Sequence, residues 1–182
     1  MSKANAIKGL VLDMDGVLYV DESAIPGADE TLRLLRARNI PFRFITNTST
    51  RPPEELQARM AAFGFEVRDG EIFSAVSATY RYLEQANKPR IHLLVADAVS
   101  ACFEHFPRDG HSPDFVVIGD IGERWNYTVL NEVFCMLMRG ARLVCMHRNK
   151  YWQTAQGLKM DIGAFVAGLE YVAGTQAIVI GK

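Results

Sequence analysis

The sequence has few of the features that would set it apart from ordinary globular proteins. It has only three cysteines, an odd number at wide spacing, so neither a disulfide framework nor a zinc site is expected. Cys102, Cys135 and Cys145 lie in apolar stretches, which is typical of buried structural cysteines. No apolar run reaches the roughly 18 residues of a membrane span, and the first residues contain no apolar signal core. We therefore expect a cytoplasmic protein with no membrane partner.

An excess of positive charge is also missing. The formal net charge is -1, and acidic and basic residues are mixed along the chain. A protein that binds nucleic acid through its phosphates needs a basic surface, so nucleic acid is not expected as a partner. Apolar residues make up 49% of the 182 positions, which is enough for one or two compact cores.

Short β-rich runs alternate with longer amphipathic stretches along the whole chain, without an internal repeat or a low-complexity linker. This alternation predicts an α/β protein with a parallel sheet. The expected strands are residues 7–12, 42–46, 91–95, 115–118, 142–146 and 177–180. The expected helices are residues 26–39, 51–63, 75–85, 99–106, 128–138 and 161–171. No helix follows the last strand, so we expect the sheet to be incomplete at that end.

The chemistry is concentrated where the first strand ends. Asp13 and Asp15 follow the apolar residues 10–12, at the kind of strand end where α/β proteins bind ligands. We expect the chain to turn after Asp13 so that both acids converge on one ligand, and Gly16 gives the backbone that freedom. Two close carboxylates favour a Mg²⁺ ion. The alternative is a loop in which both acids are merely solvated.

Three segments in order resemble the motifs of haloacid dehalogenase-type phosphatases. Residues 12–19 (LDMDGVLY) resemble the first motif, residues 44–50 (FITNTST) the second, and residues 179–182 (VIGK) the third. The long insert before the third motif resembles the α/β cap of the NagD-like branch, through residues 117–120, 139–143 and 163–171. Residues 147–152 (HRNKYW) are similar to the group in that branch that contains phospholysine phosphohistidine inorganic pyrophosphate phosphatase.

The resemblance implies a Rossmann-like parallel-sheet core with an inserted α/β cap domain. The core would comprise residues 1–70 and 177–182, incomplete at its C-terminal end, and the cap would comprise residues 71–176. A homodimer through cap surfaces is an expectation by analogy.

The resemblance also implies residue roles. Asp13 would attack phosphorus and form an aspartyl phosphate, and Asp15 would protonate the leaving oxygen and deprotonate water. Both aspartates would hold Mg²⁺. Phosphate oxygens would be bound by Gly16, Thr46, Asn47 and Lys182, and Lys182 would also offset negative charge during transfer.

Cap residues would select the substrate. The expected roof consists of residues 123–127 and 147–152, with His147, Asn149 and Lys150 as contacts for the leaving group. The alternative for residues 147–150 is a solvated polar turn after a strand. The other histidines, His92, His105 and His111, lack the spacing of a metal site.

One feature of the family is missing from the pattern. A Gly-Asp motif with a further acid normally follows the lysine and completes the metal shell. Gly119 and Asp120 precede Lys182, so their order is wrong, and we expect a cap turn there. For this polypeptide alone the pattern predicts weak Mg²⁺ binding and poor turnover. Two functions stay open: a phosphatase acting on a small phosphorylated metabolite, and a truncated or degenerate non-catalytic binding or regulatory module.

Overall fold

The computed structural model describes residues 8–154 and 157–182, so Ile7, the expected start of the first strand, lies outside the described residues. The chain divides into two compact units. The first unit contains the chain up to Thr46 and residues 53–73, and the second contains residues 47–52 and 74–182. Within the described residues, no helix is both long and apolar enough to cross a membrane.

The first unit is built on a three-stranded sheet in the order β1-β4-β5. Its strands are β1 (Leu10–Asp13), β4 (Phe42–Thr46) and β5 (Ile72–Ser74), and β1 and β4 are parallel with Asp13 opposite Ile45. Two helices, α1 (Ala28–Ala37) and α2 (Pro53–Ala62), supply Leu32, Leu56 and Met60 to a core that also holds Phe42 and Phe44. A short antiparallel ribbon joins β2 (Tyr19–Val20) to β3 (Ser23–Ala24).

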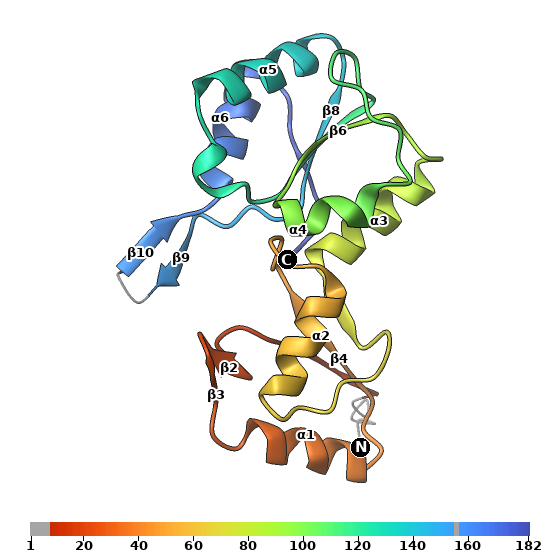
Figure 1. Cartoon of the computed structure of the whole chain (residues 1–182), viewed down its shortest axis with the longest axis vertical. Coiled ribbons are helices and arrows are strands. Elements are labelled where there is room, and N and C mark those ends of the chain that lie inside the picture. Colours follow the sequence, from red (N-terminus) through yellow and green to blue (C-terminus); the bar gives the residue numbers. More distant parts are fainter. Residues whose placement is uncertain (1–7, 155–156) are drawn as a thin grey trace, which may run out of the picture. The chain divides into compact units, whose positions relative to one another are not determined.

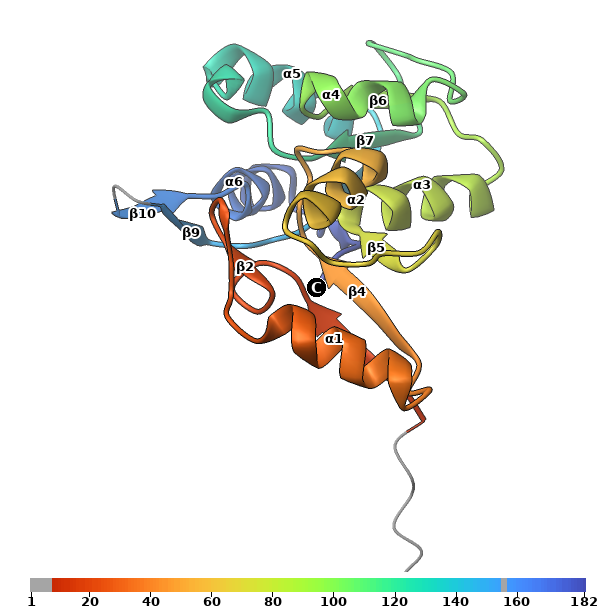
Figure 2. The ribbon, with the colours of Figure 1, turned by 60° about the horizontal axis from the view of Figure 1, so that its bottom comes forward.

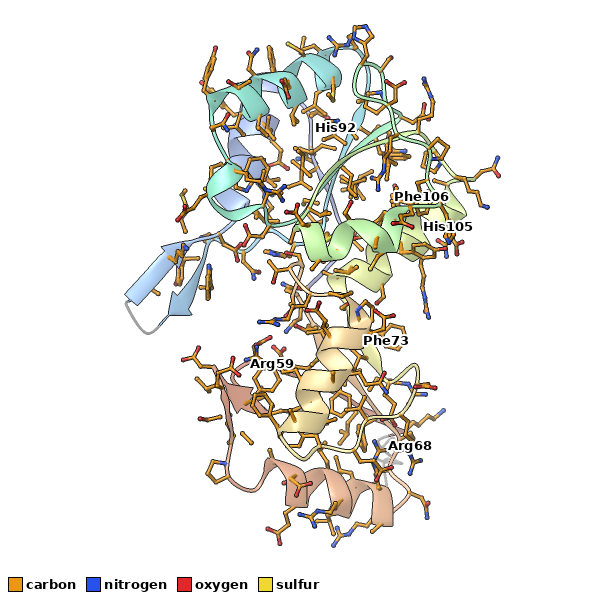
Figure 3. All side chains as sticks on the ribbon, viewed as in Figure 1. Arg59, Arg68, Phe73, His92, His105 and Phe106 are labelled. Carbon is orange, nitrogen blue, oxygen red and sulfur yellow. The ribbon has the colours of Figure 1, made fainter. Side chains whose placement is uncertain are left out.

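Two arginines of the first unit combine ionic and aromatic contacts. Arg36 donates two hydrogen bonds to the Glu71 carboxylate, at 2.9 and 2.7 Å, and lies over the Phe42 ring. Burial tends to raise the pKa of Glu71, but Arg36 and the Arg68 N–H outweigh it, and the net pKa lies below its ordinary value. Arg59, which Figure 3 labels, lies 3.3 Å from a Glu22 carboxylate oxygen. Its guanidinium lies over the rings of Tyr19 and Phe63.

The second unit is a three-layer α/β/α arrangement (Figure 1). Its four parallel strands, in the order β11-β8-β7-β6, are β6 (Ile91–Leu94), β7 (Phe115–Ile118), β8 (Arg142–Cys145) and β11 (Ile178–Val179). Successive residues of each strand point to opposite faces of the sheet. Val117 and Val144 belong to the core cluster on one face, and Val116 and Leu143 belong to the cluster on the other. One face is covered by α3 (Ala75–Gln85), α4 (Asp97–Ser100) and the 3₁₀ turn Ala101–Phe103. The opposite face is covered by α5 (Tyr127–Met138) and α6 (Gly163–Ala173).

An antiparallel hairpin precedes α6 in this unit (Figure 2). It consists of β9 (Tyr151–Thr154) and β10 (Gly157–Met160), with Tyr151 paired to Met160. No strand or helix was predicted for residues 151–160, so the hairpin was missed. The hairpin has four exposed apolar side chains, those of Tyr151, Trp152, Leu158 and Met160. Its strands therefore lack the alternation of buried apolar and exposed polar residues by which a strand is predicted from sequence.

Most expected elements are present, and the class of fold is confirmed. The structure has β4 at 42–46, α3 at 75–85 and β7 at 115–118, as predicted. The helix expected at 99–106 is wrong in form: α4 ends at Ser100 and tighter turns follow, with Glu104 N–H bonded to the Ala101 carbonyl. These turns bury both Phe103 and Phe106.

The strand expected at 177–180 pairs with β8 of the second unit, as β11. Residues 177–182 therefore group with the segment predicted to be the cap. The division into a core and a cap stays a prediction.

Candidate active site

The end of β1 forms the tight turn that two cooperating aspartates require. β1 ends at Asp13, Met14 is fully buried, and the N–H groups of Val17 and Leu18 both donate to the Met14 carbonyl. Gly16 has φ +78, in the left-handed region that glycine tolerates best. Its N–H donates to the Tyr19 carbonyl at 2.8 Å. The predicted turn is therefore present, and the Gly16 N–H donates the bond that closes it. The phosphate-binding role of Gly16 stays a prediction.

The second strand of the sheet brings Thr46 to Asp15. The Thr46 hydroxyl donates to Asp15 Oδ2 at 3.3 Å, and Thr46 is buried while Asp15 is exposed. This contact arises because parallel neighbours end at the same edge of a sheet, with Asp13 opposite Ile45. Met14 N–H donates to Asp13 Oδ1 at 2.8 Å, which orients that half-buried carboxylate. The first unit thus gathers an aspartate pair and a hydroxyl at one strand edge.

Asn47 follows β4 directly and belongs to the second unit. There its side chain binds the backbone of Lys182. Lys182 N–H donates to Asn47 Oδ1 at 2.9 Å, and Asn47 Nδ2 donates to the Lys182 carbonyl at 2.6 Å. The same Nδ2 donates to Asn149 Oδ1 at 3.1 Å. Three of the expected site residues, Asn47, Asn149 and Lys182, therefore lie together within this unit.

His147 is buried rather than exposed. It is 4% exposed, and its Nε2 lies 3.2 Å from the hydroxyl oxygen of Ser49, which is also buried. The Asn149 N–H donates to Nδ1 at 3.4 Å, and the Asp161 carboxylate lies 3.9 Å from the same nitrogen. Burial lowers the pKa of His147 below its ordinary value, although the charges of Asp161 and Asp120 oppose that shift. These contacts favour a neutral ring whose Nε2–H donates to Ser49.

Residues 148–150 close the base of the β9–β10 hairpin. The Lys150 carbonyl accepts from Asp161 N–H, and the Asn149 carbonyl accepts from Gly163 N–H. A side chain at Gly163 would put its Cβ 2.3 Å from the Asn149 carbonyl oxygen, so this approach requires glycine. Asn149 is half-buried and Lys150 is exposed. Of the three residues expected to contact substrate, these two have accessible side chains.

The aspartate pair of the first unit offers oxygen ligands to a metal. Asp13 and Asp15 supply two carboxylates and the backbone carbonyls of the turn, a set that suits Mg²⁺ with retained waters rather than a softer ion. Over residues 8–154 and 157–182, the side chains form no group of three or more acids, histidines or cysteines arranged to hold a metal. The two aspartates therefore fit a part of a magnesium shell.

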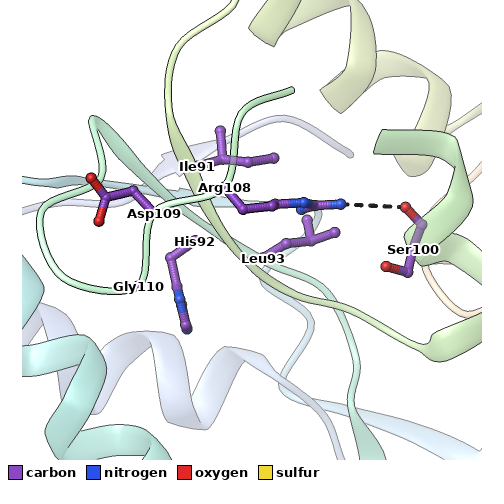
Figure 4. A pocket seen from close by; sticks show the side chains of 7 residues that line it. All are labelled: Ile91, His92, Leu93, Ser100, Arg108, Asp109 and Gly110. Carbon is purple, nitrogen blue, oxygen red and sulfur yellow. Dashed lines mark hydrogen bonds between the residues drawn. The ribbon is translucent and has the colours of Figure 1, made fainter. Parts of the chain in front are cut away.

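A separate hollow in the second unit has no converging chemistry. It has a volume of about 340 Å³ and is lined by residues of β6, by Ser100 at the end of α4 and by residues 108–110, including Arg108. Figure 4 shows the Arg108 guanidinium directed to the Ser100 carbonyl, at 3.5 Å, while His92 points elsewhere. Burial lowers the pKa of His92. We therefore place the candidate active site at the motif residues and not in this hollow.

Comparison with known proteins supplies the family. Residues 10–106 match the family described as haloacid dehalogenase-like hydrolase. Haloacid dehalogenase-like hydrolase domain-containing protein 2 of Rattus norvegicus is 36% identical over 182 residues, all of this chain and 69% of that protein. The chain belongs to the haloacid dehalogenase-like hydrolases. Its expected identity as a member of this family is confirmed.

Other proteins similar to this chain are named as phosphatases. Phospholysine phosphohistidine inorganic pyrophosphate phosphatase of Rattus norvegicus is 32% identical, over 99% of this chain and 68% of that protein. The crystal structure of a 4-nitrophenylphosphatase from Thermotoga maritima has a TM-score of 0.87 at 28% identity, over 97% of this chain and 69% of that one. The expectation that the chain is a hydrolase with an α/β fold is confirmed by these findings.

Several residues of the second unit were not predicted as part of the site. Ser49, Asp161, Gly163 and Gly181 surround the expected residues. Ser49 stood within the second motif, but nothing in that run of polar residues distinguished a buried serine from an exposed one. Asp161 and Gly163 gave no local signal, because their roles depend on contacts across the hairpin.

Proposed function

We propose that this hydrolase is a phosphatase that releases phosphate from a small phosphorylated metabolite through an aspartyl-phosphate intermediate. The observation that carries the proposal is the hydrogen bond between Thr46 and Asp15 at the strand edge that also bears Asp13. The phosphatase relatives and the matching fold support the same reaction class.

The reaction has two displacements. In the first, an Asp13 carboxylate oxygen bonds to phosphorus while the bond from phosphorus to the leaving oxygen breaks, and Asp15 donates a proton to that oxygen. In the second, Asp15 takes a proton from water as the water oxygen attacks phosphorus and the Asp13 acyl phosphate breaks. The products are the dephosphorylated metabolite and inorganic phosphate, and both aspartates regain their initial protonation states.

The remaining residues bind and orient the phosphoryl group. The Thr46 hydroxyl and the backbone N–H of Asn47 would donate to phosphate oxygens, and the Lys182 ammonium would offset their charge. A Mg²⁺ ion held by an Asp13 oxygen and the Asp15 carbonyl would supply further positive charge to the phosphate. We propose Asn149 and Lys150 as contacts of the leaving group, and we omit His147 because its ring is buried.

Charge and composition bear on where the enzyme acts and on what it binds. We propose a cytoplasmic enzyme that acts on small molecules and engages neither nucleic acid nor membranes. The net charge of -1 and the mixed distribution of charges support this proposal. A homodimer through the predicted cap surfaces is part of the same proposal.

The deciding experiment compares the protein expressed from its complete coding sequence with its Asp13→Asn variant. Phosphate release is measured with pyrophosphate, p-nitrophenyl phosphate and sugar phosphates, with Mg²⁺ and with EDTA. We expect release that needs Mg²⁺ and falls by at least about 10⁴-fold in the variant, because no carboxylate nucleophile is left. Absence of release from every substrate with Mg²⁺ present would favour the non-catalytic binding module.

A further inference from the structure

The carboxamide of Asn47 binds one residue through both of its backbone groups. Its Oδ1 accepts the Lys182 N–H at 2.9 Å, and its Nδ2 donates to the Lys182 carbonyl at 2.6 Å. A neighbouring β-strand makes the same pair of bonds to a residue of its partner, so the side chain fixes the Lys182 backbone as a strand would. The third contact of the carboxamide, to Asn149 Oδ1 at 3.1 Å, ties it to the base of the hairpin.

The backbone just before Lys182 leaves room for the Asn47 carboxamide. The pairing with β8 continues past β11, because Ile180 N–H donates to the Cys145 carbonyl and Gly181 N–H to the Met146 carbonyl. A Cβ at Gly181 would lie 2.7 Å from Asn47 Oδ1 and 2.4 Å from the Met146 oxygen. Only glycine permits both approaches, so the strand and the Asn47 carboxamide together determine where the Lys182 backbone lies.

We propose that Asn47 is a positioning residue: its carboxamide anchors the Lys182 backbone so that the lysine ammonium is delivered to the phosphoryl group. This inference rests on the proposed function, in which Lys182 supplies the positive charge. A lysine ammonium sits on a flexible four-carbon stem, so its placement depends on the anchoring of its own Cα. The Asn47 side chain thus acts through Lys182, apart from any contact of the Asn47 backbone N–H with phosphate.

The first test is a double-mutant cycle with p-nitrophenyl phosphate as substrate. Asn47→Ala removes the carboxamide and keeps the backbone N–H. We expect kcat to fall by about 10- to 100-fold with KM changed by less than about threefold, since misplacement by about 1 Å can cost that much rate. In a Lys182→Ala background the same substitution should change kcat by less than about twofold. Equal losses in the two backgrounds would overturn the proposal.

Matched variants separate the anchor from general damage. Gly181→Ala should also lower kcat, because its methyl group would enter the space of both the Asn47 carboxamide and the Met146 carbonyl. Gly168→Ala, where an added Cβ meets no atom within 4 Å, and Asn131→Ala on the exposed face of α5 are the controls. Both controls should keep kcat within about twofold of the parent.

A second measurement does not depend on turnover. Amide hydrogen exchange at Lys182, followed by NMR, should be about fivefold faster in Asn47→Ala and unchanged in Asn131→Ala, because loss of one hydrogen bond is worth about 1 kcal/mol. Unchanged exchange at Lys182 would overturn the anchoring role even in an active enzyme. Faster exchange in a protein that releases no phosphate would support the anchor and reject the phosphatase instead.

Discussion

Thr46 and Asp15 share a hydrogen bond of 3.3 Å although 31 positions separate them in the sequence. The buried threonine donates and the exposed carboxylate accepts, so Thr46 orients the residue that we propose as the general acid and base. The bond exists because β1 and β4 lie side by side in parallel. This hydrogen bond thus connects the first motif to the second.

The first prediction concerns the hydroxyl of Thr46. Thr46→Val keeps the shape of the side chain but removes the donor, and we expect kcat/KM for p-nitrophenyl phosphate to fall by about 10- to 100-fold, the range for a hydrogen bond to a charged group. Thr46→Ser keeps the donor and should retain most activity. Equal activity in the two variants would show that the hydroxyl has no part in the reaction.

A second prediction addresses the pair of half-buried Arg36 and buried Glu71. Glu71→Gln should lower the free energy of unfolding by about 1.5–3 kcal/mol, because Arg36 would lose its hydrogen-bonded carboxylate and keep only the Glu66 carboxylate, 3.8 Å from its Nε. Urea denaturation measures this change. Arg36→Met combined with Glu71→Leu should recover much of the loss.

The exposed pair of Asp29 and Arg33 on α1 is the matched control for that substitution. Asp29→Asn should cost no more than about 1 kcal/mol. The pKa of Glu71 is lowered in the folded protein, so the contribution of the pair is present above its ordinary pKa of 4.5 and is lost as the pH falls through the folded value. A cost for Glu71→Gln as small as that of Asp29→Asn would contradict the prediction.

The third prediction follows from the burial of His147. Its pKa is lowered on folding from an ordinary value of 6.5, so the unfolded chain takes up a proton first as the pH falls. The stability contributed by the neutral ring is therefore complete above about 6.5 and is lost as the pH falls toward the folded pKa. We expect His147→Gln to flatten the dependence of unfolding free energy on pH between about 7 and 5.

His105→Gln is the control for the imidazole, since His105 is exposed (Figure 3). His92, whose pKa is also lowered by burial, is present in both variants and cancels in the comparison. If His105→Gln changed the pH dependence as much as His147→Gln, the neutral buried ring would not be its source.

The fourth prediction concerns thiol reactivity. Burial, with the charge of Glu170, raises the pKa of Cys145 to about 11, and the residue is inaccessible. In the variant Cys102→Ser/Cys135→Ser, the remaining thiol should resist a disulfide reagent at pH 8 until the protein is unfolded, because the thiolate is the reactive form. Rapid labelling of the folded variant would show that β8 opens locally.

Many elements of the fold could be predicted from local pattern. The runs at 42–46 and 115–118 are strands and the run at 75–85 is a helix, because each has the hydrophobic period and the boundary residues of its element. The hairpin of β9 and β10 was missed, since it presents large apolar side chains to solvent and so violates the usual relation between polarity and burial.

Local sequence was sufficient to predict the chemical character of the site: the acids at the end of an apolar strand, the turn at Gly16 and the family that these motifs indicate. Which groups meet depends on the tertiary structure. Ser49 and His147 are 98 positions apart, and Asn47 and Lys182 are 135 apart. Their contacts depend on strand order and on backbone approaches such as those at Gly163 and Gly181. A local pattern records propensity and periodicity, whereas such contacts arise only when distant segments pack into one unit.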